Sequence, residues 1–407
     1  MLTTEVAVIG GGIQGAGVAQ AAAAAGYEVM LFEKSGWGAA TSSSSSKLIH
    51  GGLRYLESGD IKLVYENLAE RELLLRNAPE LVKPTPFYIP VYKNSTRPAW
   101  QIQIGLLLYR LLARFTRTSE FHRLDPRAWR YLDSLQINDL RAVFQYWDAQ
   151  TDDRLLTRAV VKSAMELGAK AFCPAELVKG EALEDGYKLL LKIKGKPVYC
   201  HAKTVVNAAG PWVNEVQERL DSTLPQADIT LVRGSHIVIP GTLVKGIYYL
   251  QSPIDNRPLF AMPWRDNILV GTTEAEHTGS LDEISASPAE IDYLQRSFAH
   301  HFPGKNTEVL ESFAGVRVLP TGDSTTNKRS RETIFVTDLE RAVLENGSAD
   351  HGDEQTAKEK TARTLAIYGG KLTGYRLTGE KALEKLRPTL GEREPVADTR
   401  SLTIKPA

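Results

Sequence analysis

Cysteine is almost absent from this sequence of 407 residues. Only Cys173 and Cys200 occur, and they lack the short spacing that is typical of zinc ligands. Two cysteines cannot form the disulfide framework of a small secreted protein. We therefore expect ordinary buried thiols, no metal site, and a reducing compartment, which is the cytoplasm.

Excess charge of one sign is also lacking, because 49 Lys and Arg residues balance 49 Asp and Glu residues. No field over the whole protein would attract nucleic acid, so recognition of an anion has to be local. The sequence has no run of about 18 apolar residues, which a transmembrane helix requires. The start, MLTTEVAVIGGG, has no basic segment and runs directly into a strand pattern, which argues against a signal peptide.

The stretch VAVIGGGIQGAGVAQAAAAAGYEVMLFEK predicts a strand, a glycine turn, an alanine-rich helix and a second strand. Gly10, Gly12 and Gly15 fit the G-x-G-x-x-G pattern, in which the backbone approaches a pyrophosphate at a helix N-terminus. Glu33 ends the second strand, where a carboxylate can accept hydrogen bonds from ribose hydroxyls. This βαβ unit predicts a dinucleotide site, for either FAD or NAD.

Two later stretches favour FAD. KTVVNAAGPWVNEV predicts a strand followed by a turn, and LAIYGGKLTGYRLTGEKALEKL predicts a strand, a Gly-Gly turn and a helix. A nicotinamide dehydrogenase does not need these late returns to the nucleotide domain. In an FAD protein the last helix would direct its N-terminus at the flavin, where the helix dipole stabilises the negative charge of the reduced ring. Either stretch alone would fit a buried strand and turn, but the three in this order predict FAD.

Five consecutive serines stand in TSSSSSKLIHGGLRYLE. A serine run by itself is typical of a flexible linker. This one leads directly into a dense group of polar, basic and glycine residues. With GGGIQGAG, LAERELLLRNAP, VNAAGPWV, RGSHIVIP, GTTE, AGVRVLP and YGGKLTGYR in the same order, it resembles the FAD-dependent glycerol-3-phosphate dehydrogenases over about residues 5–390.

The resemblance implies an α/β fold in which a discontinuous, Rossmann-like FAD-binding domain carries an inserted mixed-sheet substrate domain. We expect the FAD-binding domain at 1–80, 150–218 and 341–390, the substrate or cap domain at 81–149 and 219–340, and a tail at 391–407. Family members typically continue into a C-terminal helical region, so the chain resembles a short form. The oligomeric state stays open.

In this family the serine segment wraps the FAD, and the segment KLIHGG leads beneath the isoalloxazine. Gln14, Ser44 and Gly374 stand where the family usually has Asn, Arg and Thr. Besides Gly10, Gly12, Gly15 and Glu33, the residues that the resemblance places at the FAD are Thr41, Ser42, Ser46, Lys47, Leu48, His50, Gly51, Ala209, Gly210, Gly370, Lys371, Leu372 and Thr373.

Oxidation of a phosphorylated secondary alcohol needs cations for the phosphate. Arg54, Arg317, Arg331 and Lys371 lie far apart in sequence but match the pocket motifs of the family. The planar fork of arginine can bind phosphate with two hydrogen bonds. Tyr55 is a further candidate for a hydrogen bond to the substrate, and the Thr373 hydroxyl could contact flavin or substrate.

A base for the hydroxyl proton is the other requirement, and His236 and His50 compete for this role. Histidine suits proton transfer because its ordinary pKa is near neutral pH. A histidine in a β-branched strand is often a core residue. By resemblance His236 faces the pocket and His50 supports the flavin, so His236 is our predicted base.

The sequence thus predicts FAD-dependent oxidation of sn-glycerol 3-phosphate to dihydroxyacetone phosphate, with electrons passed to a quinone or another acceptor. One alternative is a related flavin oxidase that uses oxygen and acts on another hydroxy acid or an amine. A second alternative is a redox-inert FAD-binding protein.

RPAWQIQIGLLLYRLLARFTR predicts an amphipathic helix that is too short to span a bilayer. Its apolar stripe comprises Ile104, Leu107, Leu108, Leu111, Leu112 and Phe115, with Arg110, Arg114 and Arg117 along the flank. The pattern fits a core-packed helix or a helix lying in a membrane interface. Because the predicted acceptor is a quinone, we expect peripheral contact with the inner face of the cell membrane.

Overall fold

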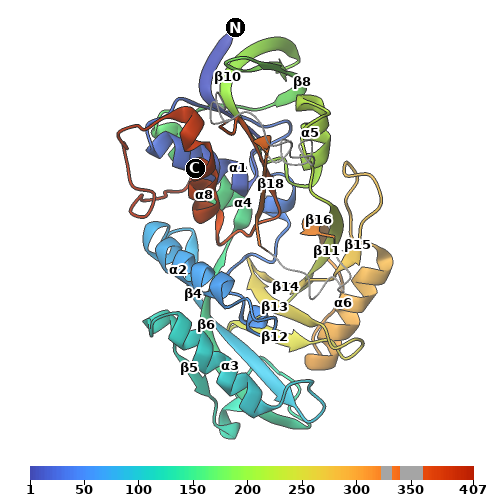
Figure 1. The fold of residues 1–407 in the computed structure, drawn as a ribbon. Coiled ribbons are helices and arrows are strands. Elements are labelled where there is room, and N and C mark those ends of the chain that lie inside the picture. Colours follow the sequence, from blue (N-terminus) through green and yellow to red (C-terminus); the bar gives the residue numbers. More distant parts are fainter. Residues whose placement is uncertain (322–331, 340–360) are drawn as a thin grey trace, which may run out of the picture.

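The computed structural model of the protein describes residues 1–321, 332–339 and 361–407. In these residues the strands form an eight-stranded and a ten-stranded sheet, which lie in the upper and lower parts of Figure 1. The first sheet holds the nucleotide-binding turn, and the second holds most of the remaining strands. The predicted α/β fold with a mixed second sheet is confirmed.

The first sheet runs in the order β17-β18-β10-β1-β2-β7, and hairpin strand β9 also pairs with β10 and with β8. Five of its strands, β1, β2, β7, β10 and β18, pair in parallel, whereas β17 is antiparallel to β18. The strands are β1 (Leu2–Ile9), β2 (Val29–Phe32), β7 (Lys170–Phe172), β8 (Ala175–Leu183), β9 (Gly186–Ile193), β10 (Lys196–Asn207), β17 (Ile334–Thr337) and β18 (Thr364–Tyr368).

Helices cover both faces of this sheet. Helices α1 (Ile13–Ala24), α4 (Asp153–Glu166) and α8 (Tyr375–Leu390) share one apolar core with β1, β10 and β18. Helix α5 (Val213–Leu220) and the β8–β9 hairpin close the other face. The small residues of α1 allow close helix packing, because a Cβ on Gly17 would lie 2.7 Å from the Tyr375 carbonyl oxygen in α8.

The second sheet runs in the order β15-β11-β14-β13-β12-β4-β6-β3, with β16 added to β11 and β5 added to β6. Strand β4 pairs antiparallel with β6 and parallel with β12, so the sheet is mixed. The strands are β3 (Leu48–Ile49), β4 (Val82–Tyr92), β5 (Phe121–Arg123), β6 (Leu140–Thr151), β11 (Ile229–Pro240), β12 (Ile247–Gln251), β13 (Pro258–Trp264), β14 (Asn267–Gly271), β15 (Ala275–Glu276) and β16 (Glu311–Pro320).

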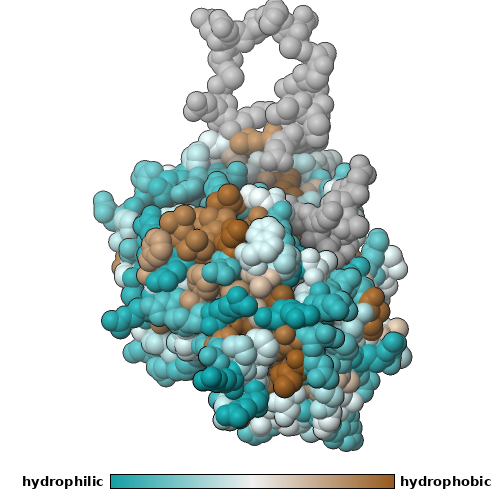
Figure 2. All heavy atoms as spheres, turned by 90° about the horizontal axis from the view of Figure 1, so that it is seen from below, coloured by the Kyte–Doolittle hydropathy of each residue, from teal (hydrophilic) through white to brown (hydrophobic). Residues whose placement is uncertain are grey.

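Helix α6 (Pro288–His301) packs on one face of the second sheet, and α2 (Ile61–Asn77) and α3 (Ala99–Leu112) pack on the other. Helix α3 buries Leu106 and Tyr109 but leaves Ile104, Leu107 and Leu111 more than half exposed. Figure 2 views the molecule from below and shows apolar side chains gathered in patches on this lower face. In the described part of the chain, no helix combines the length and the hydropathy needed to cross a membrane.

The strands of each sheet come from separate stretches of the chain. The first sheet draws on residues 2–32, 170–207 and 334–368, and the second draws on 48–151 and 229–320. Strand β3 follows the serine run and already belongs to the second sheet. The expected domain boundary at 341 lies outside the described residues.

Residues 391–407 pack against the first-sheet side of the molecule. Val396 N donates to the Ala24 carbonyl oxygen at the end of α1, and Ile404 N donates to the Asn77 carbonyl oxygen at the end of α2. The Ile404 side chain is buried in the core beneath α1 and α8.

Short 3-10 helices complete the described elements. They are η1 (Thr41–Ser43), η2 (Leu53–Leu56), η3 (Arg117–Ser119), η4 (Pro126–Tyr131) and η5 (Gly210–Trp212).

Candidate active site

A cavity of about 320 Å³ lies where the two sheets meet. Its walls include the β1–α1 turn, the serine run, the turn after β10 and the β18–α8 turn. The other walls come from the second sheet, through residues of β4, β6, β12, β13 and β16. The cavity thus lies at the carboxyl ends of the parallel strands, where open α/β sheets bind ligands.

The glycine turn is built for close backbone packing. A Cβ on Gly15 would lie 1.9 Å from the Gly10 carbonyl oxygen, so a larger residue would force the turn open. Glu33 supports this turn, because its Oε2 accepts a hydrogen bond from Gly11 N at 2.7 Å. The N-terminus of α1 therefore faces the cavity through a tight, fixed turn, as a pyrophosphate site requires.

The serine run is anchored along its length. Ser42 Oγ accepts from Ile13 N, the first residue of α1, at 2.9 Å. Ser45 donates to Asp153 through both its N–H and its hydroxyl, at 2.9 and 2.6 Å. Ser46 Oγ lies 3.0 Å from Nε2 of His236. These bonds connect the run to α1, α4 and β11, so it forms an ordered wall of the cavity.

Lys47 supports this wall from behind. Its Nζ lies 2.6 Å from Asp153 Oδ1, and both side chains are buried. Lys47 is absent from the cavity wall, although the sequence placed it at the FAD. Because its amine is held against α4, Lys47 orients the serine run. Its side chain does not line the cavity.

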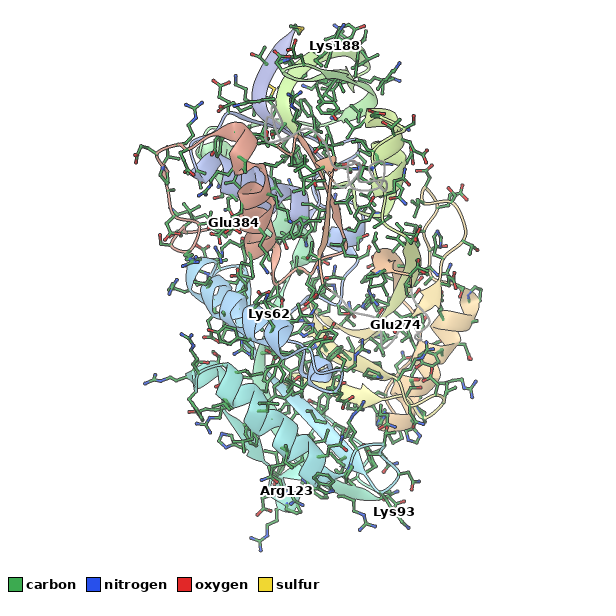
Figure 3. The ribbon with its side chains drawn as sticks, viewed as in Figure 1. Lys62, Lys93, Arg123, Lys188, Glu274 and Glu384 are labelled. Carbon is green, nitrogen blue, oxygen red and sulfur yellow. The ribbon has the colours of Figure 1, made fainter. Side chains whose placement is uncertain are left out.

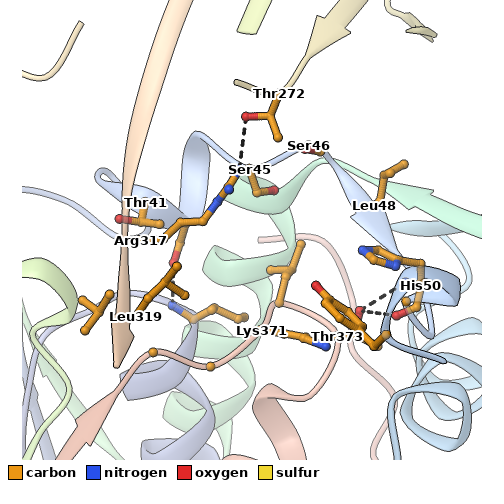
Figure 4. A pocket seen from close by; sticks show the side chains of 18 of the residues that line it. Thr41, Ser45, Ser46, Leu48, His50, Thr272, Arg317, Leu319, Lys371 and Thr373 are labelled. Atoms are coloured by element: carbon orange, nitrogen blue, oxygen red, sulfur yellow. Dashed lines mark hydrogen bonds between the residues drawn. The ribbon is translucent and has the colours of Figure 1, made fainter. Parts of the chain in front are cut away.

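The β18–α8 turn forms the opposite wall. Gln14 Nε2 donates to the Lys371 carbonyl oxygen at 3.1 Å, which ties this turn to the start of α1. Gln14 Oε1 is buried and has no hydrogen-bond partner in the described residues. His50 N donates to Thr373 Oγ1 at 3.2 Å, and Figure 4 shows these two residues side by side.

Three of the four predicted phosphate-binding cations reach the cavity, namely Arg54, Arg317 and Lys371. Arg317 Nη2 donates to Thr272 Oγ1 at 3.1 Å (Figure 4). Lys371 Nζ lies 3.7 Å from the ring centroid of Tyr55, which also lines the cavity. Arg331 lies outside the described residues.

The two candidate bases differ in position. His50 lines the cavity, whereas His236 is fully buried behind Ser46 and stacks on Phe313 with ring centroids 5.0 Å apart. Burial, with the charges of Arg317 and Lys47, holds the pKa of His236 well below its usual value. The structure thus places the His236 ring behind Ser46, and the role of His236 as the base stays a prediction.

The structure brings most of the predicted residues together and leaves some behind the wall. The predicted residues that line the cavity are Gly12, Thr41, Ser42, Ser46, Leu48, His50, Arg54, Tyr55, Gly210, Arg317, Gly370, Lys371, Leu372 and Thr373. The predicted residues that do not line it are Gly10, Gly15, Glu33, Lys47, Gly51, Ala209 and His236.

Several residues that line the cavity were not predicted from the sequence. An aromatic group comprises Phe87, Tyr146, Tyr249 and Phe260, and a polar pair comprises Arg257 and Glu274. The aromatic residues lie in ordinary strand patterns, so no sequence signal separates them from core residues. Glu274 ends the GTTE motif, which was a signal that could have found it.

Residues 5–344 match the family described as FAD dependent oxidoreductase. The chain belongs to this FAD-dependent oxidoreductase family. FAD is therefore the cofactor of this flavoprotein.

Its curated relatives confirm the resemblance drawn from the motifs. The flavoprotein is 36% identical to a glycerol-3-phosphate dehydrogenase of Pseudomonas aeruginosa, covering 96% of this chain and 73% of the relative. It is 35% identical to D-erythritol 1-phosphate dehydrogenase of Brucella abortus, covering 95% and 74%. The Bacillus halodurans glycerol-3-phosphate dehydrogenase complexed with FAD has the same fold, with a TM-score of 0.75 at 24% identity, covering 99% of this chain and 68% of that one.

The residues present fit FAD. The tight glycine turn offers backbone to a pyrophosphate, and the Ser42 hydroxyl that accepts from Ile13 keeps its own proton for a phosphate oxygen. The buried Gln14 Oε1 could accept a hydrogen bond from the cofactor. These groups lie on one continuous wall from α1 to the β18–α8 turn.

Proposed function

We propose that this flavoprotein oxidises sn-glycerol 3-phosphate to dihydroxyacetone phosphate. The observation that carries the proposal is the convergence of Arg54, Arg317 and Lys371 on one cavity between the sheets. These residues come from η2, β16 and the turn before α8. The two curated relatives given above are named as dehydrogenases of phosphorylated polyols. These names support the same substrate class.

The cations bind the phosphate. Arg317 is held in place by Thr272, so its guanidinium meets the anion in a fixed orientation. A preorganised fork loses less rotational freedom when it binds a phosphate than a mobile side chain does. Lys371 and Arg54 add charge from the other walls. The ring centroid of Tyr55 lies 3.7 Å from Lys371 Nζ and 5.8 Å from Arg54 Cζ.

His50 is the base in this proposal, in place of His236. His50 lines the cavity, and its backbone is held by the Thr373 hydroxyl at 3.2 Å. His50 accepts the proton of the substrate hydroxyl, and bound FAD supplies the acceptor for the hydride at flavin N5. His236 keeps the serine run in place through Ser46.

Anaerobic titration of the purified holoprotein tests the proposal. Glycerol 3-phosphate should bleach the flavin absorbance, whereas free glycerol, which has no phosphate, should not. D-erythritol 1-phosphate and glycine serve as comparison substrates, because they represent a longer phosphorylated polyol and an amine. Bleaching by glycine but not by either phosphorylated polyol would favour an amine oxidase, and a flavin that no substrate bleaches would favour a redox-inert protein.

We further propose that the electron acceptor is a quinone. Helix α3 then brings the protein to the membrane in which the quinone is dissolved. Five apolar side chains are each more than half exposed: Trp100, Ile104, Leu107 and Leu111 on α3, and Phe115 just after its end. The guanidinium of Arg110 lies over Phe115, with the Cζ atom 5.5 Å from the ring centroid. An exposed apolar helix face flanked by arginines fits the boundary between acyl chains and anionic headgroups.

Sedimentation with anionic liposomes tests this contact. The wild-type protein should sediment at low salt and dissociate as salt rises, because salt screens the arginine–headgroup attraction. Replacing Leu107 and Leu111 with Asp should abolish sedimentation. Met165→Asp is the control, since Met165 is half exposed on α4, away from α3. Wild-type protein that stays in solution at low salt would contradict the membrane contact and favour a soluble acceptor.

A further inference from the structure

Glu274 is a carboxylate in a cavity whose other charged walls are mostly cationic. It lies between β14 and β15, at mid-height of the molecule in Figure 3, and its side chain is only 7% exposed. The other carboxylate on the wall, Glu332, is exposed. Among the described residues that line the cavity, Glu274 is therefore the buried carboxylate.

Three arginines surround it. Arg317 Nη1 donates to Glu274 Oε1 at 3.3 Å, and Arg54 Nη2 lies 4.0 Å from the same oxygen. Arg257 Nη1 donates to the backbone carbonyl oxygen of Glu274 at 3.0 Å. These contacts fix both the backbone and the carboxylate, so Glu274 is presented to the cavity in one orientation.

A carboxylate at this position weakens the attraction for a phosphate, since it offsets part of the positive charge. Glu274 is not required to orient Arg317, because Thr272 also holds the guanidinium. The cations cannot accept a hydrogen bond from the substrate, whereas Glu274 can. Arginine and lysine can only donate hydrogen bonds, whereas a polyol phosphate also carries hydroxyl protons that need an acceptor.

We propose that Glu274 determines specificity by accepting a hydrogen bond from the substrate hydroxyl next to the reacting carbinol. In glycerol 3-phosphate this is the terminal hydroxyl, while the phosphate lies on the arginines. The inference rests on the proposed function and narrows it to phosphorylated polyols, in contrast to phosphorylated alcohols with one hydroxyl. A site built around a hydroxyl rejects the analogue that lacks it, because the methyl group of the analogue excludes water from the carboxylate without offering it a hydrogen bond.

The test compares glycerol 3-phosphate with propane-1,2-diol 1-phosphate, which keeps the phosphate and the secondary alcohol but has a methyl group instead of the terminal CH2OH. The wild-type holoprotein should prefer glycerol 3-phosphate by at least about a hundredfold in kcat/KM. Glu274→Met, which has similar volume and no strong acceptor, should reduce this preference to about threefold or less. Glu274→Gln keeps a neutral acceptor and should retain an intermediate preference.

Glu276→Gln is the matched control, because Glu276 is exposed on β15 two residues away and should leave the preference unchanged. The flavin absorbance of each variant shows that it is folded and holds FAD. Equal losses of kcat/KM for both substrates in Glu274→Met, with the preference kept, would overturn the inference and leave Glu274 as a neutraliser of the arginines. Failure of glycerol 3-phosphate to reduce the wild-type flavin would instead overturn the proposed function.

Discussion

His50 and His236 carry the same imidazole in different surroundings. His50 meets the cavity, whereas His236 is enclosed by Ser46, Phe313 and the β14 strand. The register of β11 brings His236 opposite Gly271, and a Cβ on Gly271 would lie 2.1 Å from the His236 ring. The ring therefore fills a space that depends on a glycine, which is a packing role.

Substitution of the two histidines should separate these roles. His50→Gln should lower kcat for glycerol 3-phosphate by about a hundredfold or more, because it removes the proposed base. His236→Gln should lower kcat by less than about tenfold, because its side chain does not reach the cavity. Stopped-flow measurement of anaerobic flavin reduction checks both. A larger loss in His236→Gln than in His50→Gln, in protein that keeps its FAD, would reverse the assignment.

Arg317 offers a second test at the residue scale. Arg317→Ala removes a charge-assisted contact worth about 2 kcal/mol, so kcat/KM for glycerol 3-phosphate should fall by roughly tenfold to a hundredfold. Arg317→Lys should recover only part of this loss, because lysine keeps the charge without the planar fork.

The control for Arg317 is Arg296→Ala. Arg296 lies on α6 with a side chain that is 66% exposed. Steady-state kinetics should show no change in this control. An unchanged kcat/KM in Arg317→Ala would remove Arg317 from the phosphate site.

At the scale of elements, a buried ion pair joins α2 to β6 behind the cavity. Arg71 Nη1 lies 2.5 Å from Asp148 Oδ1, and both side chains are almost fully buried. Tyr109 of α3 donates to Asp148 and accepts from Gly51 N at 2.8 Å, so the pair also supports the loop after β3. Three elements thus meet behind the glycines that precede Arg54.

Breaking this pair should destabilise the fold. Arg71→Met leaves the Asp148 charge buried without its partner, so the free energy of unfolding should fall by about 3–5 kcal/mol. Adding Asp148→Asn should recover part of the loss, because the double variant no longer buries the lone carboxylate. Urea unfolding checks this, with Arg296→Met as a surface control that should cost less than about 1 kcal/mol. Equal losses in the single and double variants would show that packing of the arginine, and not charge, is what matters.

At the scale of the whole molecule, buried histidines make stability depend on acid. Burial lowers the pKa of His301 to about 4, while its Nε2 lies 2.8 Å from the Gln251 carbonyl oxygen. The folded pKa lies below the unfolded value near 6.5, so acid protonates the unfolded chain first. This stability contribution is present above about pH 6.5 and is lost as the pH falls towards 4.

His301→Gln should therefore reduce the acid sensitivity of the protein. The wild-type free energy of unfolding should fall by about 2 kcal/mol more than that of the variant between pH 7 and pH 5. Urea unfolding at several pH values measures the difference. The same pH dependence in both proteins would show that His301 does not contribute, which would leave His236 and the carboxylates as the source.

The sequence predicted the elements that bring the FAD site together, because their signals are local. A glycine turn between a strand and a helix has a fixed spacing. Gly10 and Gly12 lie in the turn between β1 and α1, and Gly15 lies in the first turn of α1. Motif resemblance then predicted Arg54, Arg317 and Lys371, which do reach one cavity. The serine run was also interpreted as a cofactor loop only because of the family motifs on both sides of it.

What the sequence by itself determined is thus the nucleotide-binding turn, the FAD family and the set of residues near the site. Only the tertiary structure decided which of these side chains face the cavity. His236 and His50 both stand in strand-like segments, and a one-residue change of register would exchange the two faces of a strand. Likewise Lys47 is drawn to Asp153, and Glu274 is placed among arginines from η2, β16 and the position just before β13. These contacts join segments that lie far apart in sequence. Such contacts depend on how the two sheets pack together, and no local pattern in the chain encodes them.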